Sequence, residues 1–250
     1  MMLMSVMDGQ PSCDLYPELA GARVLITGLS PACGVDVARA FADHGARLVL
    51  QIPDTSTETH ALLEVLARTA SDISVFHETL QDGAQALCFA QTAVREFGGL
   101  DIVINLIPFA LSGLPAAPTA TMIEEAIAAR FRVPYMVMRV AANRMQLTWT
   151  EGLILNVLTT PVPQSRAEAS FAALAGTVLA TMTRVEASQR AAQAVRINAV
   201  VPARVPEWRE HVRQPSEPDI ANLALLLASR RGKMLSGLAF DADGVAEAGV

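Results

Sequence analysis

The sequence predicts an α/β fold, with one doubly wound parallel sheet of about seven strands and helices on both of its faces. Short β-branched or aliphatic runs alternate with longer helical patterns along the whole chain of 250 residues. The strand candidates are continuous apolar runs, which is typical of strands that are covered by helices on both faces. The chain has no internal repeat and no linker long enough to separate two domains, so we expect a single domain.

The alternation of these patterns assigns the elements in chain order. Strands are expected at residues 23–27, 47–52, 73–77, 101–105, 153–158, 195–201 and 238–240. Helices are expected near residues 34–44, 57–70, 83–97, 119–147, 166–190 and 218–229. The crossovers are expected to be right-handed, and the strand order expected for a doubly wound sheet of this type is 3-2-1-4-5-6-7. Residues 21–250 are expected to form this domain, and residues 1–20 are expected to be an N-terminal extension.

The composition argues against several classes of function. The net charge is −6 and no basic block could neutralise phosphates, so nucleic acid is not expected as a partner. No apolar run approaches the roughly 18–20 residues of a membrane span, and the Met-rich start lacks the basic region of a signal peptide. The three cysteines and four histidines have no metal-like spacing. We therefore expect reduced thiols, no metal site, no membrane contact and a cytoplasmic protein.

A turn with two glycines joins the first predicted strand to the first predicted helix. It reads Thr27-Gly28-Leu29-Ser30-Pro31-Ala32-Cys33-Gly34, and its layout is that of a dinucleotide-binding βα unit. Further marks follow in the order "FGGLDIVIN", "GLILNV", "VRINAVVP", "EPDIANLALLLAS" and "LSGLAFDADG". From about Ala22 to Gly244 the chain resembles the short-chain dehydrogenase/reductase family. The resemblance implies a Rossmann-type fold and an NAD(P)-dependent ancestry.

The resemblance also implies a glycine-rich turn around the cofactor pyrophosphate, and this chain departs from it. The family turn looks like Thr-Gly-x-x-x-Gly-x-Gly, which lets backbone N–H groups approach the phosphates. Ala32 places a Cβ where the middle glycine is expected, and Pro31 removes one N–H donor. Each of these changes alone could be tolerated. Whether the chain binds a dinucleotide therefore depends on the other residues of the cleft.

Three further positions implied by the resemblance have also changed. Ile52 stands where the adenosine ribose needs an acidic residue, and Asp54 lies two residues further on, behind a proline. Thr79 replaces the Asp expected near the adenine, and Asn105 is followed by Leu-Ile-Pro where small residues belong. No cofactor is therefore expected in this chain. The positions interpreted as vestigial are Gly28, Ser30, Ala32, Gly34, Ile52, Thr79 and Asn105.

The family's catalytic residues are a Ser, a Tyr, a Lys four residues after it and an Asn. The Tyr acts as a general acid, and the Lys lowers its pKa. Counting back from Arg184 puts the Tyr position at Ala172 and the Lys position at Gly176. Counting from the fifth strand puts the Ser position at Thr159, and the Asn position holds Arg130. An Arg does not release a proton in the usual pH range, so we expect no catalytic residue in this chain.

The helices expected at 119–147 and 166–190 could explain why the fold is retained although its catalytic site is lost. In the family these helices pack against those of another subunit as a four-helix bundle. Small residues for close helix approach are present in the second helix: Ala172, Ala173, Ala175, Gly176 and Ala180. We therefore expect a heterotetramer in which this chain stabilises a catalytically intact sibling that holds NAD. Such a pairing is similar to the dehydrogenase that oxidises 2-[hydroxy(phenyl)methyl]succinyl-CoA in anaerobic toluene degradation.

Two other functions stay open from the sequence. A divergent enzyme of the halohydrin-dehalogenase type also abandons the dinucleotide, although it needs Ser, Tyr and Arg and the Tyr is missing here. A sensor that binds a dinucleotide or an acyl-CoA without turnover would also keep the fold, with Arg130 as a candidate anion contact. Halide release would identify the first function, and calorimetric titration with NAD(H), NADP(H) and CoA esters would identify the second.

Overall fold

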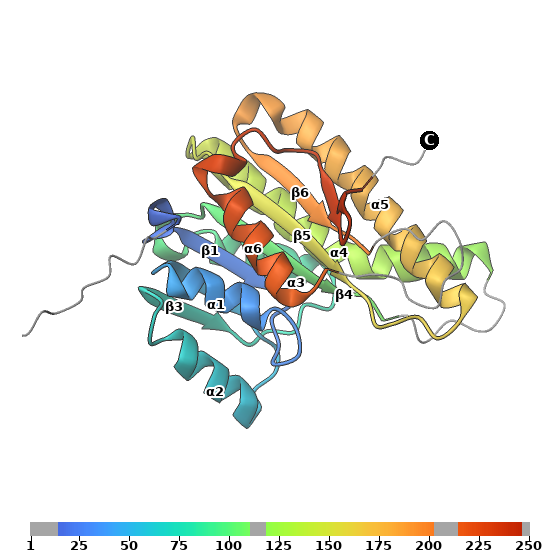
Figure 1. Ribbon diagram of the computed structural model, residues 1–250, viewed down its shortest axis with the longest axis horizontal. Helices are drawn as coiled ribbons and strands as arrows, with labels where there is room; N and C mark the ends of the chain where they lie inside the picture. The colour runs from blue at the N-terminus through green and yellow to red at the C-terminus, as the bar shows by residue number, and fades with distance from the viewer. Residues whose placement is uncertain (1–14, 111–118, 203–214, 247–250) are drawn as a thin grey trace, which may run out of the picture.

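Seven parallel strands and one short antiparallel strand form a sheet in the order β3-β2-β1-β4-β5-β6-β7-β8 (Figure 1). The structure is a computed structural model that describes residues 15–110, 119–202 and 215–246. The strands are β1 (Arg23–Thr27), β2 (Arg47–Gln51), β3 (Asp72–Phe76), β4 (Ile102–Pro108), β5 (Leu153–Thr159), β6 (Arg196–Val200), β7 (Ala239–Asp241) and β8 (Gly244–Val245). The predicted fold class and the predicted order of the first seven strands are confirmed.

Helices cover both faces of this sheet (Figure 1). They are α1 (Val35–Asp43), α2 (Thr57–Leu66), α3 (Gly83–Ala93), α4 (Ala120–Leu147), α5 (Arg166–Arg190) and α6 (Glu217–Ala228). Short 3-10 helices lie at Pro17–Leu19, Glu96–Gly98, Ala191–Gln193 and Arg230–Gly232. Helices α1, α2 and α6 share one apolar core with the sheet, whereas α3 and α4 share a second core on the opposite face. Helix α5 joins α4 over the ends of β4 and β5.

Among the α-helices that the structure describes, α1 alone begins without a side-chain cap. Helices α2 to α6 each follow a polar residue whose side chain accepts a backbone N–H of the first turn: Ser56, Asp82, Thr119, Ser165 and Ser216. Helix α1 follows Gly34 instead, which has a φ of +87° and offers no side-chain cap. The first turn of α1 therefore has no side-chain cap from its N-cap residue.

The structure differs from the sequence prediction at several element boundaries. Helices α2 and α3 end at Leu66 and Ala93, each four residues before its predicted end at residue 70 or 97. A short eighth strand, β8, pairs antiparallel with β7 and extends the expected seven strands. Strand β4 runs on to Pro108, because it stays paired with β5 through Pro108 and Thr159. Leu19 is only 2% exposed and belongs to the core, so the folded domain begins before the predicted boundary at residue 20. Residues 1–14 of the predicted extension lie outside the described residues.

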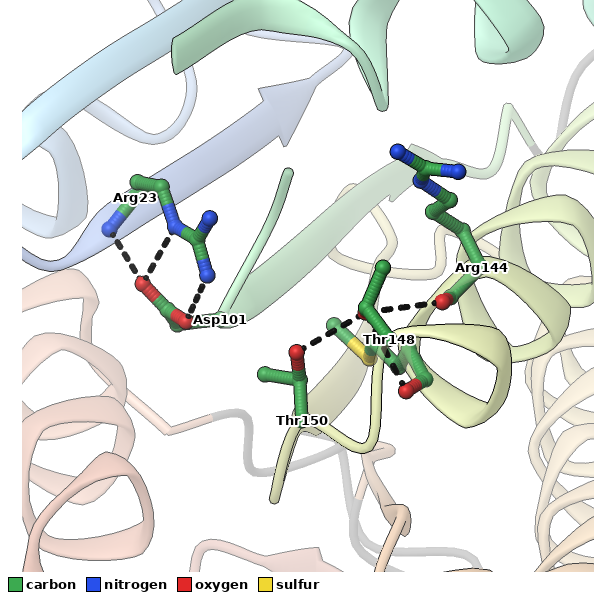
Figure 2. Close-up of polar contacts among 6 residues, drawn as sticks. Arg23, Asp101, Arg144, Thr148 and Thr150 are labelled. Atoms are coloured by element: carbon green, nitrogen blue, oxygen red, sulfur yellow. Dashed lines mark hydrogen bonds and ion pairs between the residues drawn. The ribbon is translucent and has the colours of Figure 1, made fainter. Parts of the chain in front are cut away.

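An ion pair joins the first residues of two neighbouring strands at the amino edge of the sheet. Figure 2 shows the Arg23 backbone N–H and Nε donating to one carboxylate oxygen of Asp101, while a terminal guanidinium nitrogen donates to the other. The shortest of these contacts is 2.6 Å, and both side chains are about three-quarters buried. Nearby, the Thr148 hydroxyl donates to the Arg144 carbonyl and so closes the last turn of α4 (Figure 2).

Replacing Asp101 with Asn is expected to destabilise the fold by about 1–2 kcal/mol at pH 7, because the variant loses a charge-assisted, bidentate pair. Burial alone would raise the pKa of Asp101, but the hydrogen bonds and charge of Arg23 outweigh it, and the net pKa lies below the usual value. Such a group stabilises the fold above its unfolded pKa, and this stability is lost as the pH falls through the lower folded pKa. Urea unfolding of both proteins between pH 7 and pH 3 should show the difference shrinking at low pH. A difference that stays constant across this range would contradict the pairing.

Candidate functional site

The carboxyl ends of β1, β4 and β5 and the start of α1 surround a pocket of about 600 Å³. Ligands of open α/β sheets bind at this edge. Five of the predicted positions line the pocket: Ser30, Ala32, Gly34, Arg130 and Thr159. The others do not line it: Gly28, Ile52, Thr79, Asn105, Ala172 and Gly176. The structure therefore brings five of the predicted positions together around one pocket, and the other six lie outside its lining.

Backbone N–H groups of the turn between β1 and α1 already have partners within the chain. Ser30 and Cys33 exchange two backbone hydrogen bonds, with N–O distances of 3.0 and 3.1 Å. The Gly28 N–H donates to the side-chain oxygen of Gln51 at 2.7 Å, and the Leu29 N–H donates to the Gln51 carbonyl. Since Pro31 carries no N–H, most donors that a pyrophosphate would need in this turn are occupied or missing.

Leu106 fills the space directly above the same turn. Its side chain is only 4% exposed. A Cβ built on Gly34 would overlap the Leu106 Cδ1 atom, and a Cβ built on Gly28 would overlap the Leu106 carbonyl oxygen. The two glycines are thus required by the chain's own packing, which supports their interpretation as turn residues. A phosphate cannot approach a backbone that an isobutyl side chain already covers.

The adenosine end of the expected cleft lacks a free polar group for a ribose. Ile52 is fully buried in the core, where it offers no polar group to a ribose. The Asp54 carboxylate instead accepts hydrogen bonds from the hydroxyls of Ser56 and Thr59 at the start of α2. The Ser56 hydroxyl, followed by that of Thr59, holds the pKa of Asp54 below its usual value. Thr79 is exposed on the loop after β3. Neither the turn nor this end of the cleft fits a dinucleotide.

The positions of the family's catalytic residues are spread over three environments. Thr159 lies at the end of β5, with its hydroxyl 3.8 Å from the Cys33 sulfur. Arg130 is exposed on α4 at the rim of the pocket. Ala172 is fully buried, and a Cβ on Gly176 would lie in ordinary contact with Val201. Ala172 and Gly176, which the residue count predicts to be the family's Tyr and Lys positions, therefore contribute to packing in this chain.

A cluster of aromatic rings occupies the region between the pocket and α5. Phe109 is 1% exposed, and its ring centroid lies 4.9 Å from that of Phe171 and 6.1 Å from that of Phe131. Ala172 belongs to the same apolar cluster. This role of Phe109 could not be predicted from the sequence, because it requires α4, α5 and the end of β4 to meet in space.

Asn105 has a structural role in the sheet. Its side-chain oxygen accepts the Thr27 hydroxyl at 2.9 Å, and its side-chain nitrogen donates to the Asn156 side-chain oxygen at 2.8 Å. All three residues are buried, so these bonds satisfy polar groups that would otherwise lack partners. They connect β1, β4 and β5 side by side. Asn105 is therefore not available to a ligand in the pocket.

Two titratable groups that the sequence analysis did not single out line the pocket. They are Cys33 and Glu217, and Glu217 is the first residue of α6. Burial raises the pKa of the Cys33 thiol, the hydrogen bond with Thr159 opposes this rise, and the negative charge of Glu217 adds to it. The thiol is thus held in its neutral form, which is a weak nucleophile. Glu217 could have been predicted as a pocket residue, because it begins a helix that follows the carboxyl end of a strand.

An apolar groove of about 670 Å³ lies on the surface between α4 and α5. Its lining is largely aliphatic, and it includes Ile123, Ile127, Phe131, Leu174, Val178 and Met182. Leu174 is 42% exposed there. This groove lies on the pair of helices for which the sequence predicts a partner contact.

A network of hydrogen bonds and one ion pair links α4 to α5. The Tyr135 hydroxyl on α4 donates to the Glu186 carboxylate on α5 at 3.0 Å. Arg190 pairs with the same carboxylate at 3.3 Å and also donates to the Asn143 side-chain oxygen. Burial and the neighbouring Glu186 raise the pKa of Tyr135, so this phenol is a poor proton donor. The network sets the relative position of the groove walls.

The described residues include neither a cluster of metal ligands nor a helix suited to span a membrane. Within residues 15–110, 119–202 and 215–246, no three His, Cys, Asp or Glu side chains come together as a metal site would require. No helix in these ranges combines the length and the apolarity that a membrane span needs.

Comparison with known proteins identifies the family. A family model described as enoyl-(acyl carrier protein) reductase matches residues 30–244. L-fucose dehydrogenase of Rattus norvegicus is 28% identical over 227 residues, which cover 86% of this chain and 78% of that protein. Glucose 1-dehydrogenase 2 of Bacillus subtilis is 24% identical over 198 residues, which cover 76% of this chain and 74% of that protein. A short-chain dehydrogenase/reductase of Serratia marcescens has a similar fold, with a TM-score of 0.71 at 18% identity over 88% of this chain and 96% of that one. The chain belongs to the short-chain dehydrogenase/reductase family of oxidoreductases.

Proposed function

We propose that this chain is the non-catalytic subunit of a hetero-oligomeric, NAD-dependent short-chain alcohol dehydrogenase. In that assembly it binds no dinucleotide and stabilises a sibling subunit that carries the intact Tyr, Lys and NAD site. The main support for the proposal is that apolar or small residues occupy the positions where the family's cofactor and catalytic residues are expected. Leu106 covers the phosphate turn, and buried Ala172 and Gly176 stand at the positions of the acid and its Lys.

The groove between α4 and α5 is the proposed contact with the sibling. Its aliphatic walls would gain free energy when another pair of helices covers them, at roughly 25 cal/mol for each Å² removed from water. The sibling needs a matching apolar face on its own helices. A heterotetramer of two such pairs is the proposed assembly.

The proposed reaction of the assembly is the oxidation of an alcohol by NAD in the sibling subunit. Relatives named as L-fucose dehydrogenase and glucose 1-dehydrogenase support a hydroxyl group as the substrate. Within that class we propose a hydroxyacyl-CoA of the 2-[hydroxy(phenyl)methyl]succinyl-CoA type, in anaerobic toluene degradation. Its support is the resemblance in the pattern of lost site residues. A cytoplasmic location is also proposed, in keeping with the free thiols of Cys33 and Cys88.

Co-expression with an intact relative encoded beside this chain tests the proposal. We expect the two chains to co-purify and to oxidise the alcohol together, with activity abolished by replacing the relative's catalytic Tyr with Phe. Thr159→Ala in this chain is the matched change, and it should leave the activity of the complex within about twofold, since this hydroxyl faces no reacting atoms in the proposal. Separate purification of two chains, with the relative fully active alone, would contradict the proposal.

A further inference from the structure

The pocket at the ends of β1, β4 and β5 contains two charged side chains, Glu217 and Arg130, which are not the groups that a dinucleotide needs. Its walls include the apolar side chains of Val37, Leu106, Phe109, Val157 and Ile220. Its volume of about 600 Å³ is within the range of sites for small molecules, about 300–1,000 Å³. Such walls favour a compact ligand with an apolar body.

The carboxylate of Glu217 provides the first polar contact. Its Oε1 atom is buried and accepts no hydrogen bond from the residues that the structure describes. Ser216, and not Glu217, caps the first turn of α6, so the carboxylate is not engaged by its own helix. A buried carboxylate oxygen without a donor is unfavourable. A ligand N–H or O–H at this position would remove that cost.

Arg130 provides the second polar contact, of opposite charge. It lies on α4 at the rim of the pocket, and its guanidinium has no ion-pair partner among the described residues. A guanidinium suits carboxylate and other oxyanion groups because its N–H donors lie in one plane. The pocket is therefore lined by a half-buried carboxylate with one buried, unpaired oxygen and by an exposed guanidinium, together with apolar walls.

The geometry points to a binding site for a small zwitterion with an apolar body. Its ammonium group would be directed at Glu217 and its carboxylate at Arg130, as in an ω-amino acid. This inference goes beyond the proposed subunit role, because the ligand would occupy a chain that performs no chemistry. It does not depend on the partner and is tested on this chain alone.

Calorimetric titration with ω-amino acids from 4-aminobutanoate to 8-aminooctanoate tests the site, and the series covers different spacings of the two charges. Each compound is compared with the alkanoate and the alkylamine of the same length, which lack one of the two groups. We expect at least one amino acid to bind at least tenfold more tightly than both of its analogues. Glu217→Gln and Arg130→Gln should each reduce that binding at least fivefold.

Glu64→Gln and Arg68→Gln, which change exposed charges around the C-terminal end of α2, are the matched controls and should leave binding unchanged. Circular dichroism checks that all four variants are folded. Failure of every amino acid to bind would overturn the inference. Equal binding of an amino acid and its analogues, or binding unaffected by both pocket variants, would also overturn it. A failure of co-purification with a sibling leaves these titrations unaffected, so the two proposals fail separately.

Discussion

Replacing Leu174 with Asp is expected to detach this chain from its sibling. Leu174 is 42% exposed and lines the apolar groove between α4 and α5, which is the proposed contact surface. A carboxylate buried in an apolar interface without a partner is strongly unfavourable. An interface position of this kind contributes about 2 kcal/mol or more, so we expect the dissociation constant to rise at least about 30-fold. Analytical ultracentrifugation of the co-expressed chains measures the change.

Val65→Asp is the matched control for this prediction. Val65 is also an aliphatic residue on a helix and is 37% exposed, but it lies on α2, away from the groove. Both variants should unfold within about 0.5 kcal/mol of the unmodified chain, because neither side chain belongs to the core. Equal assembly by the two variants would exclude the groove as the contact surface.

Replacing Phe109 with Ala is expected to cost about 3–5 kcal/mol of unfolding free energy. Phe109 is 1% exposed and packs against Phe131 and Phe171, so the truncation leaves a cavity between α4, α5 and the end of β4. Urea denaturation of this chain alone measures the loss. This prediction tests whether packing has replaced chemistry in the region where the family places its catalytic Tyr.

Phe109→Leu separates lost volume from a lost ring, since it keeps most of the apolar bulk. We expect this variant to lose about 1–1.5 kcal/mol, well below the loss of the Ala variant. A Phe109→Ala protein that is as stable as the unmodified chain would show that the ring lies in open space. In that case the aromatic cluster would not fill the space around Ala172, and our inference that this space serves packing would be wrong.

Most of the longer elements could be predicted because their apolar periodicity is a local property of the sequence. Helix α5 has the bounds expected from its sequence, and strands β1 and β5 lie within a residue of theirs. The eighth strand, Gly244–Val245, could not be predicted, because two residues have no periodicity and become a strand only by pairing with β7. The burial of Leu19 likewise depends on distant segments that cover it.

Counting along the chain predicts which residues stand at the candidate site positions, but not what surrounds them. The identities of Ala172 and Gly176 follow directly from their spacing to neighbouring motifs. The roles of Leu106 and Phe109 do not, since they arise from contacts between segments far apart in sequence. The pairing of Gln51 with the Gly28 N–H is of the same kind, because another rotamer of Gln51 would leave the turn open.

Titration of this purified chain with NAD⁺, NADH, NADP⁺ and NADPH tests the central claim most directly. Because Leu106 covers the phosphate turn and the turn's N–H groups already have partners, we expect no binding heat and no quenching of protein fluorescence up to millimolar nucleotide. The intact sibling, titrated in parallel, should bind NAD with one site for each chain. Stoichiometric binding of any of the four nucleotides to this chain, with micromolar affinity, would contradict the account.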